Sequence, residues 1–322
     1  MLSEFDLIAR YFTRLPRSGG PVMLGVGDDC ALLAPAAGES LAISTDMLVE
    51  GRHFFAGADA QALGHKALAV NLSDLAAMGA RPLGFTLALA LPAADPAWLE
   101  PFARGLLTLA DAHDIALVGG DTTRGPLNLC ITVFGSVPFA QALRRDGAHA
   151  DDEIWISGTL GDARLALEAL QGKLTLTSDR LAIAQLRLDC PQPRNALGIA
   201  LRGIATAAID ISDGLLGDLG HLLERSGVGA VLDADALPFG AMLSLEPPER
   251  CRAFALNGGD DYELCFAAPA QCRQAVLDAA LQAGVAVARI GRLTRERGIR
   301  VTDSAGTPLT VDSLSFDHFA TP

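Results

Sequence analysis

The first half of the chain alternates between apolar runs of strand length and segments whose apolar positions recur with a helical period. This pattern predicts helices over residues 3–15 and 59–78, and a third helix beginning near Asp95. Strands are predicted over residues 30–33, 41–44, 85–91, 115–118 and 127–137. Glycine or proline marks the joins between these elements, and the order indicates a mixed α/β domain.

A polar, charged stretch between Pro138 and Glu153 interrupts this pattern. Because 322 residues are enough for roughly two domains of about 150 residues each, we place the boundary there, between residues 1–138 and 139–322. Beyond it, helices are predicted over residues 162–170, 178–188 and 213–225, and strands over residues 154–157, 230–232 and 264–267. The second domain is therefore predicted to be α+β or α/β.

Composition narrows the class of protein. Half of the residues are hydrophobic and 20% are charged, which is typical of a compact globular chain. No apolar run reaches the roughly 18 residues of a membrane span, and the N-terminus lacks the basic start of a signal peptide. The six cysteines show no CxxC spacing, which favours reduced thiols over zinc ligands or disulfides. We expect a cytoplasmic protein that does not associate with membranes.

The net charge of −13 repels nucleic acids and other polyanions, so a phosphate ligand would need bound cations. The familiar nucleotide-binding motifs are absent from the sequence. The pair Gly172-Lys173 lacks the upstream glycine of a P-loop, and no third glycine follows Gly25 and Gly27 in dinucleotide-binding register. Protein-kinase signatures and a GxSxG elbow are missing as well.

Five short motifs place aspartate beside glycine, serine or threonine at the end of a predicted strand or the start of a predicted helix. They are GVGDD (25–29), STD (44–46), NLSD (71–74), GGD (119–121) and DISDG (210–214). Carboxylates, hydroxyls and carbonyls are the oxygen ligands that Mg²⁺ prefers. Loops that lead into helices also offer N–H groups to phosphate.

Any one of these motifs, taken alone, is more typical of a helix cap or a turn. If the aspartates converged, one like-charge pair at ~4 Å would cost on the order of 4 kcal/mol at an effective dielectric constant of ~20. Only metal ions would make such a cluster tolerable. The sequence therefore predicts a site for several cations, provided that the five loops meet.

These motifs, together with further segments in the same order, resemble the thiamine-monophosphate kinase family. The further segments are KALAVNLSDLAAMGA, IDISDGLLGDLGH, GGDDYEL and the terminal FDHFATP. The resemblance covers nearly the whole chain and implies the two-domain fold of aminoimidazole ribonucleotide synthetase and selenophosphate synthetase. That fold has an α/β N-terminal domain with a mixed sheet that forms a homodimer, and an α+β C-terminal domain.

The resemblance also implies ATP-dependent phosphorylation of thiamine monophosphate to thiamine diphosphate, with several Mg²⁺ ions. The implied Mg²⁺ ligands are Asp29, Ser44, Thr45, Asp46, Asp74, Asp121, Asp210 and Asp213. The implied ATP contacts are Gly120, Asp121, Arg145 and Ser212. The implied substrate contacts are His53, Asp260 and Phe316.

Two positions depart from the family pattern. Glu is usual where this chain has Asp260, and Tyr or Trp is common where it has Phe316. An aromatic face or a carboxylate suits the cationic thiazolium of thiamine. Taken alone, Phe316 is equally suited to packing on the core, whereas His53 is more typical of a structural histidine and Arg145 of a solvated surface charge.

No side chain is predicted to act as a general base. A phosphate monoester has its second pKa near ~6, so the acceptor is already mostly a dianion, and direct in-line transfer needs only positioning and charge neutralisation. Two alternatives stay open. One is another ATP-using enzyme of the same superfamily. The absence of a Cys or Lys nucleophile just before GVGDD weighs against selenophosphate chemistry. The other is a non-catalytic protein that binds divalent cations or nucleotides.

Overall fold

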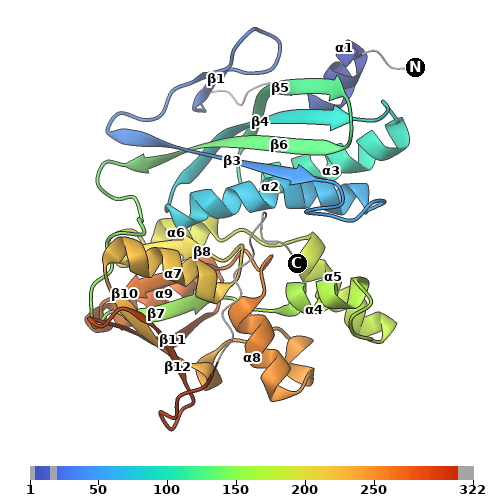
Figure 1. Ribbon diagram of the computed structural model, residues 1–322. Coiled ribbons are helices and arrows are strands. Elements are labelled where there is room, and N and C mark those ends of the chain that lie inside the picture. The colour runs from blue at the N-terminus through green and yellow to red at the C-terminus, as the bar shows by residue number, and fades with distance from the viewer. Residues whose placement is uncertain (1–3, 15–19, 311–322) are drawn as a thin grey trace. The chain divides into compact units, whose positions relative to one another are not determined.

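The computed structural model describes residues 4–14 and 20–310 of the chain (Figure 1). The first of two compact units contains the described residues up to Leu75 together with Ala80–Ala140. The second contains Ala76–Gly79 and the described residues from Gln141 onward. The boundary predicted from the sequence lies after residue 138. That prediction did not assign residues 76–79 to the second unit. No helix within the described residues is long and apolar enough to cross a membrane.

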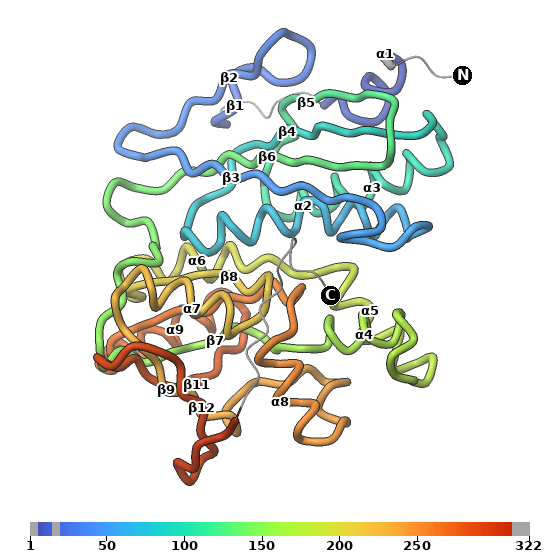
Figure 2. The backbone as a smooth tube through the Cα atoms, in the orientation of Figure 1, coloured from blue at the N-terminus to red at the C-terminus, as the bar shows by residue number. Residues whose placement is uncertain are grey.

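The first unit is built on a four-stranded mixed sheet in the order β3-β6-β4-β5. Its strands are β3 Glu39–Val49, β4 Arg81–Leu91, β5 Ala116–Arg124 and β6 Asn128–Pro138. β6 pairs antiparallel with β3 and with β4, whereas β4 and β5 run parallel. A small antiparallel ribbon of β1 Val22–Leu24 and β2 Leu32–Leu33 precedes the sheet, and the chain turns from β2 into β3 (Figure 2).

Helices cover one face of this sheet (Figure 1). The helices of the first unit are α1 Glu4–Leu7, the π-helix η1 Ile8–Phe12, α2 Ala60–Ala77, whose end enters the second unit, and α3 Pro96–Ala112. Glycines let α2 and α3 approach closely. A Cβ on Gly64 would lie 2.1 Å from the carbonyl oxygen of Phe102, and one on Gly105 would lie 1.9 Å from that of Gln61.

The alternation of side chains along the strands gives the sheet an inner and an outer face. Phe85, Leu87 and Leu89 of β4 point to the inner face and are at most 4% exposed. On the outer face, Ile43 and Met47 of β3 are 61% and 52% exposed. The first unit therefore has one well-covered face and one open, partly apolar face.

The second unit contains a six-stranded sheet in the order β12-β9-β11-β7-β10-β8. Its strands are β7 Glu153–Ser157, β8 Ala207–Asp210, β9 Gly229–Asp233, β10 Leu264–Ala268, β11 Val287–Thr294 and β12 Gly298–Thr302. Its helices are α4 Asp162–Leu170, α5 Ser178–Asp189, α6 Asn195–Ala200, α7 Leu215–Ser226, α8 Pro248–Asn257 and α9 Arg273–Ala283, with short 3₁₀ turns η2 Ala234–Ala236, η3 Leu243–Leu245 and η4 Ala270–Cys272. All strand pairs are antiparallel except β9 with β12.

Both faces of this sheet are covered, so its central strands are buried throughout. Ile154 and Ile156 of β7 join a core that includes α4 and α7. Trp155 of the same strand points the other way and stacks on Phe266, with ring centroids 6.5 Å apart, in a core that includes α6 and α9. The mixed α/β first unit and the α+β second unit confirm the fold class predicted from the sequence.

Candidate active site

Three predicted metal ligands of the first unit come together between β3 and α2. Ser44 and Asp46 point to the inner face of β3, and Asp74 lies on α2. The Ser44 hydroxyl donates a hydrogen bond to the Asp74 carboxylate. The main-chain N–H of Asp46 donates to Oδ1 of Asn71 at 3.1 Å, which fixes α2 to β3 at this point. The side chains gathered here offer only oxygen donors to a cation, and such donors fit Mg²⁺.

Thr45 points to the opposite face of β3. Its hydroxyl lies 2.9 Å from that of Thr132 on β6, and its side chain is exposed. Because neighbouring strand residues face opposite ways, the Thr45 hydroxyl is turned away from Ser44 and Asp46. If Thr45 binds a cation beside them, its main-chain carbonyl is the available donor.

Gly120 and Asp121 lie inside β5, at the other edge of the sheet. The strand register aligns Asp46 with Gly120 through Ile131 and Leu87, so three strand spacings separate the two backbones by ~14 Å. Gly120 has φ of 149°, and a Cβ there would lie 1.9 Å from the carbonyl oxygen of Leu87. Only glycine fits this position. The sheet of one chain therefore does not place Asp121 beside Asp46.

Two further predicted residues of the first unit lie in turns. Asp29 is exposed between β1 and β2, where its N–H donates to Oδ1 of Asp28 at 2.8 Å. His53 follows β3 and is half-buried, and its Nδ1 accepts the N–H of Val49 at 3.0 Å. In the neutral ring this bond places the proton on Nε2. The structure thus gives His53 a fixed orientation.

In the second unit, the DISDG motif and the GGDDYEL motif lie side by side. β8 ends at Asp210, and the N–H of Ile211 donates to the carbonyl oxygen of Glu263 at 2.8 Å. The N–H of Asp260 donates to the carbonyl oxygen of Ser212 at 2.9 Å. A Cβ on Gly259 would lie 2.4 Å from that same oxygen. The pairing of β8 with β10 therefore continues into the loops that carry predicted metal, nucleotide and substrate residues.

A buried carboxylate holds the DISDG loop from the other side. Oδ2 of Asp218, on the first turn of α7, accepts the N–H groups of Ser212 and Asp213 at 3.0 Å each. Burial raises the pKa of Asp218 to about 7, against the lowering effect of these N–H bonds. The loop ends at Gly214, which has φ of 111°. A side chain does not fit there, because a Cβ would lie 2.9 Å from the backbone of Asn257.

Two buried carboxylates hold the GGDDYEL segment. Glu263 is fully buried and binds Arg187 at 2.8 Å, Arg194 at 2.6 and 2.5 Å, and the Ser157 hydroxyl at 2.6 Å. Asp261 accepts the N–H of Gly161 at 2.9 and 3.0 Å. Burial raises the pKa of the Asp261 carboxyl well above its usual range.

The residues on either side of Asp261 have an unusual backbone. Asp260 and Tyr262 adopt φ of 66° and 49°, in the left-handed region that non-glycine residues rarely occupy. The Tyr262 hydroxyl lies 3.4 Å from Oδ1 of Asp260. A half-buried Asp260, the predicted substrate contact, thus stands on a backbone that its neighbours hold in place.

Arg145, the remaining predicted ATP contact, lines a cavity of about 430 Å³ together with His221, Glu224 and Arg225 of α7. The Ser226 hydroxyl donates to the main-chain carbonyl of Arg145 at 2.7 Å. Its lining has an excess of basic side chains, which suits an anionic ligand. Phe316 lies outside the described residues.

The predicted placement of the motifs is wrong for three of the five. STD lies in the middle of β3, NLSD inside α2 and GGD inside β5, rather than at the end of a strand or the start of a helix. The strands continue because they pair with their neighbours along their whole length, β3 with β6 as far as Val49 and β5 with β4 as far as Arg124. Within the described residues, no group of three or more His, Cys, Asp or Glu side chains is arranged as a cation site. The predicted ligands are divided between the two units.

Asp218 was not predicted from the sequence as a separate functional residue. A signal for it exists in the apolar stripe of α7, where Leu215, Leu219 and Leu222 are buried and Asp218 falls at the same helical period. An acid on the buried stripe of a helix indicates a polar partner nearby.

Comparison with known proteins places the fold in a defined class. The N-terminal domain of AIR synthase related proteins matches residues 27–137, and their C-terminal domain matches residues 150–304. The thiamine-monophosphate kinase of Escherichia coli K12 is 48% identical over 325 residues, which cover 99% of each chain. The chain therefore belongs to the thiamine-monophosphate kinase family.

Solved structures agree with this relationship. The crystal structure of a thiamine-monophosphate kinase from Stenotrophomonas maltophilia K279a matches with a TM-score of 0.84 and 49% identity, over 91% of this chain and 93% of that one. AaThiL complexed with AMPPCP and TMP matches with a TM-score of 0.73 and 28% identity, over 85% of this chain and 88% of that one.

Proposed function

We propose that this protein transfers the terminal phosphoryl group of ATP to thiamine monophosphate, giving thiamine diphosphate and ADP. The observation that carries the proposal is the direct pairing of the DISDG and GGDDYEL segments, through the bonds from Ile211 to Glu263 and from Asp260 to Ser212. The acceptor comes from the family and from a relative solved with AMPPCP, an unreactive ATP analogue, and TMP.

Magnesium ions are part of the proposal. The proposed ligands are Asp29, Ser44, Thr45 through its carbonyl, Asp46, Asp74, Asp121, Asp210 and Asp213. These oxygen donors would hold Mg²⁺, which would supply positive charge to neutralise the phosphate groups. The oxygen-only donors around Ser44 and Asp74 and the net charge of −13 both support such ions.

The chain's own residues orient the two substrates. Gly120, Asp121, Arg145 and Ser212 are proposed to contact ATP, and His53, Asp260 and Phe316 to contact thiamine monophosphate. Because the acceptor phosphate is already mostly a dianion, no residue is assigned the removal of a proton. The fixed His53 ring and the anchored backbone at Asp260 suit a role in orientation rather than in proton transfer.

A homodimer and a cytoplasmic location complete the proposal. The open face of β3 exposes Leu41, Ile43 and Met47, an apolar strip suited to a second copy of the sheet. All six cysteines are free thiols, which suits a reducing compartment. Sedimentation is expected to give a dimer that Ile43→Asp dissociates, and a monomeric wild type would contradict the assembly.

The function is tested by incubating the purified protein with ATP, Mg²⁺ and thiamine monophosphate and separating the products by chromatography. Thiamine diphosphate and ADP are expected in equal amounts, and free thiamine serves as the parallel acceptor. ATP binding without turnover would instead favour a nucleotide-binding protein. ADP formed without thiamine diphosphate would favour another ATP-using enzyme of the superfamily.

A further inference from the structure

Asp218 is a buried residue whose carboxyl group accepts hydrogen bonds from the backbone of a single loop. Its residue is 5% exposed, and one oxygen, Oδ2, accepts the consecutive N–H groups of Ser212 and Asp213 at 3.0 Å each. Two successive N–H groups that converge on one oxygen fix the orientation of both peptide planes. The hydrogen bond from the Asp260 N–H to the Ser212 carbonyl, 2.9 Å, holds the same loop from the opposite side.

Burying a carboxylate is unfavourable unless it is hydrogen-bonded, and an apolar residue would suit the Leu215 and Leu219 stripe of α7 better. The loop that Asp218 holds carries Ser212, a proposed ATP contact, and Asp213, a proposed Mg²⁺ ligand. Hydrogen bonds from backbone N–H groups to a fixed oxygen are directional, so they set angles as well as distances. A group of this kind is suited to aiming neighbouring side chains.

We infer that Asp218 is a positioning residue for phosphoryl transfer, because its carboxylate holds the peptides of Ser212 and Asp213 so that their side chains face the nucleotide and its cation. The inference rests on the proposed function. Asp218 itself touches neither substrate. Its loss is expected to act on nucleotide and metal binding and on turnover, and to leave thiamine monophosphate binding nearly unchanged.

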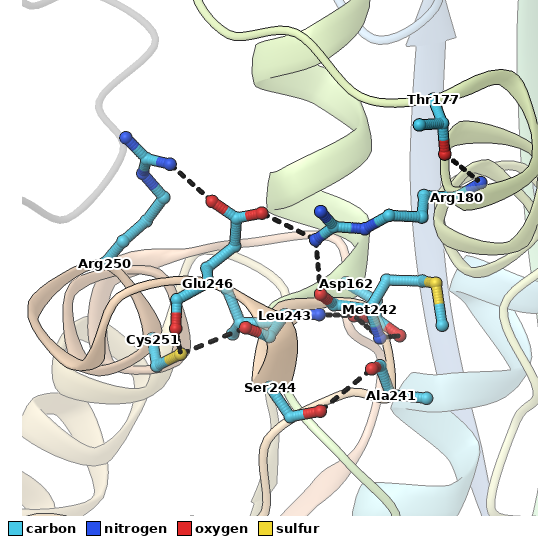
Figure 3. A network of polar contacts seen from close by, with 10 residues as sticks. All are labelled: Asp162, Thr177, Arg180, Ala241, Met242, Leu243, Ser244, Glu246, Arg250 and Cys251. Carbon is cyan, nitrogen blue, oxygen red and sulfur yellow. Dashed lines mark hydrogen bonds and ion pairs between the residues drawn. The ribbon is translucent and has the colours of Figure 1, made fainter.

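The second unit contains a matched control. Asp162, at the start of α4, is also buried, and its Oδ1 accepts the consecutive N–H groups of Met242 and Leu243 at 3.1 and 2.7 Å. Figure 3 shows this carboxylate beside the contacts that Arg180 makes with the Met242 carbonyl and with Glu246. The same chemistry thus holds a segment that carries no proposed site residue.

The experiment compares Asp218→Asn with Asp162→Asn in the full chain. Asn keeps the shape and one acceptor oxygen but replaces the second oxygen with an NH₂ donor. Asp218→Asn is expected to raise the half-saturating Mg²⁺ concentration and the KM for ATP by about 10-fold or more, as losses of supporting groups around metal ligands do. The KM for thiamine monophosphate is expected to stay within about twofold, whereas Asp162→Asn should leave all three constants near wild type.

Calorimetric titration with Mg²⁺ and an unreactive ATP analogue gives a readout that does not depend on the acceptor. Wild-type protein that binds the analogue without forming thiamine diphosphate would overturn the proposed function alone. Equal effects of the two Asn variants, or a wild-type Mg²⁺ requirement in Asp218→Asn, would overturn the positioning role. Urea unfolding of both variants separates stability from binding, and Asp218→Ala is expected to bind the analogue more weakly than Asp218→Asn.

Discussion

The two units hold their proposed site residues in place by different means. In the first unit, Ser44, Asp46 and Asp74 stand on β3 and α2, two long regular elements that one side-chain bond, from the Asp46 N–H to Asn71, ties together. In the second unit, Ser212 and Asp260 stand on loops, and buried carboxylates supply bonds that no ladder provides.

Because of this difference, substitutions in the first unit should affect ligand binding without affecting stability, whereas substitutions in the second unit should affect both. A side chain on a regular strand or helix is replaceable without loss of backbone bonds, so its removal affects the site alone. A loop that depends on buried carboxylates loses its shape and part of its stability when one of them changes. Substitutions that compare the two units test this distinction.

The largest effect is expected from Asp74→Asn in the first unit. Asn at this position still accepts the Ser44 hydroxyl bond but removes a charge from the proposed cation site. Turnover is expected to fall at least about 100-fold, the scale of losing one preorganised electrostatic group. The free energy of unfolding should change by less than about 1 kcal/mol.

Asp95→Asn is the matched control, because Asp95 caps α3 by accepting the Ala97 N–H at 2.9 Å and Asn caps helices equally well. Steady-state kinetics and urea unfolding measure both variants. A large loss of stability in Asp74→Asn, or full activity, would break the proposed contrast between the units.

Glu263→Gln is expected to give the largest loss of stability in the second unit. The substitution leaves the half-buried Arg187 and Arg194 guanidinium groups without their anion. Breaking a buried ion pair from one side costs about 3 kcal/mol or more, and urea unfolding would measure this loss. The exposed pair of Arg300 with Glu296 is the control, since Glu296→Gln should cost less than about 1 kcal/mol. Similar losses in both variants would contradict the anchoring role.

The buried Asp261 carboxyl is expected to make the free energy of unfolding depend on pH. Burial raises its pKa in the folded chain above the unfolded value of about 3.9, so the folded chain holds this proton more tightly. Its stabilising contribution is complete below the unfolded pKa and is lost as the pH rises through the folded pKa. Asp261→Asn lacks this loss and keeps an acceptor for the Gly161 N–H.

The unfolding free energy of Asp261→Asn relative to wild type is therefore expected to increase by about 1 kcal/mol or more between about pH 5 and about pH 8. Urea unfolding at several pH values measures this difference, and titrations common to both proteins cancel. A difference that stays constant across this range would show that the buried carboxyl does not couple folding to protons.

The fold was predictable where elements are long or clearly periodic. The helix predicted over residues 162–170 is α4 Asp162–Leu170, and the helix predicted over residues 59–78 is α2 Ala60–Ala77. β8 Ala207–Asp210 was not anticipated, because four residues buried on both faces show no alternation. The helix α9 Arg273–Ala283 was also not predicted, because its exposed Leu277 and Leu281 weaken the amphipathic pattern.

The site was predictable as chemistry but not as geometry. The motifs identified Asp46 and Asp121 as oxygen donors, yet only the strand register reveals that two strands separate them. Likewise, the dependence of Ser212 on Asp218 follows from a loop conformation with no local periodicity. Spacing along the chain carries little information on such contacts, because they depend on tertiary packing.

The smallest effect is expected from Thr45→Val, and it sharpens the contrast within the first unit itself. The Thr45 hydroxyl faces Thr132 on the outer side of β3, so a ligand beside Asp46 would use the main-chain carbonyl, which Val keeps. Turnover and the half-saturating Mg²⁺ concentration are expected to stay within about twofold of wild type, equivalent to ~0.4 kcal/mol. Ser44→Ala, one residue away on the inner face, should weaken Mg²⁺ binding by about 10-fold. If both variants lose activity alike, the alternation of β3 does not decide which side chains reach the cation, and strand geometry alone would no longer explain how the first unit holds its ligands.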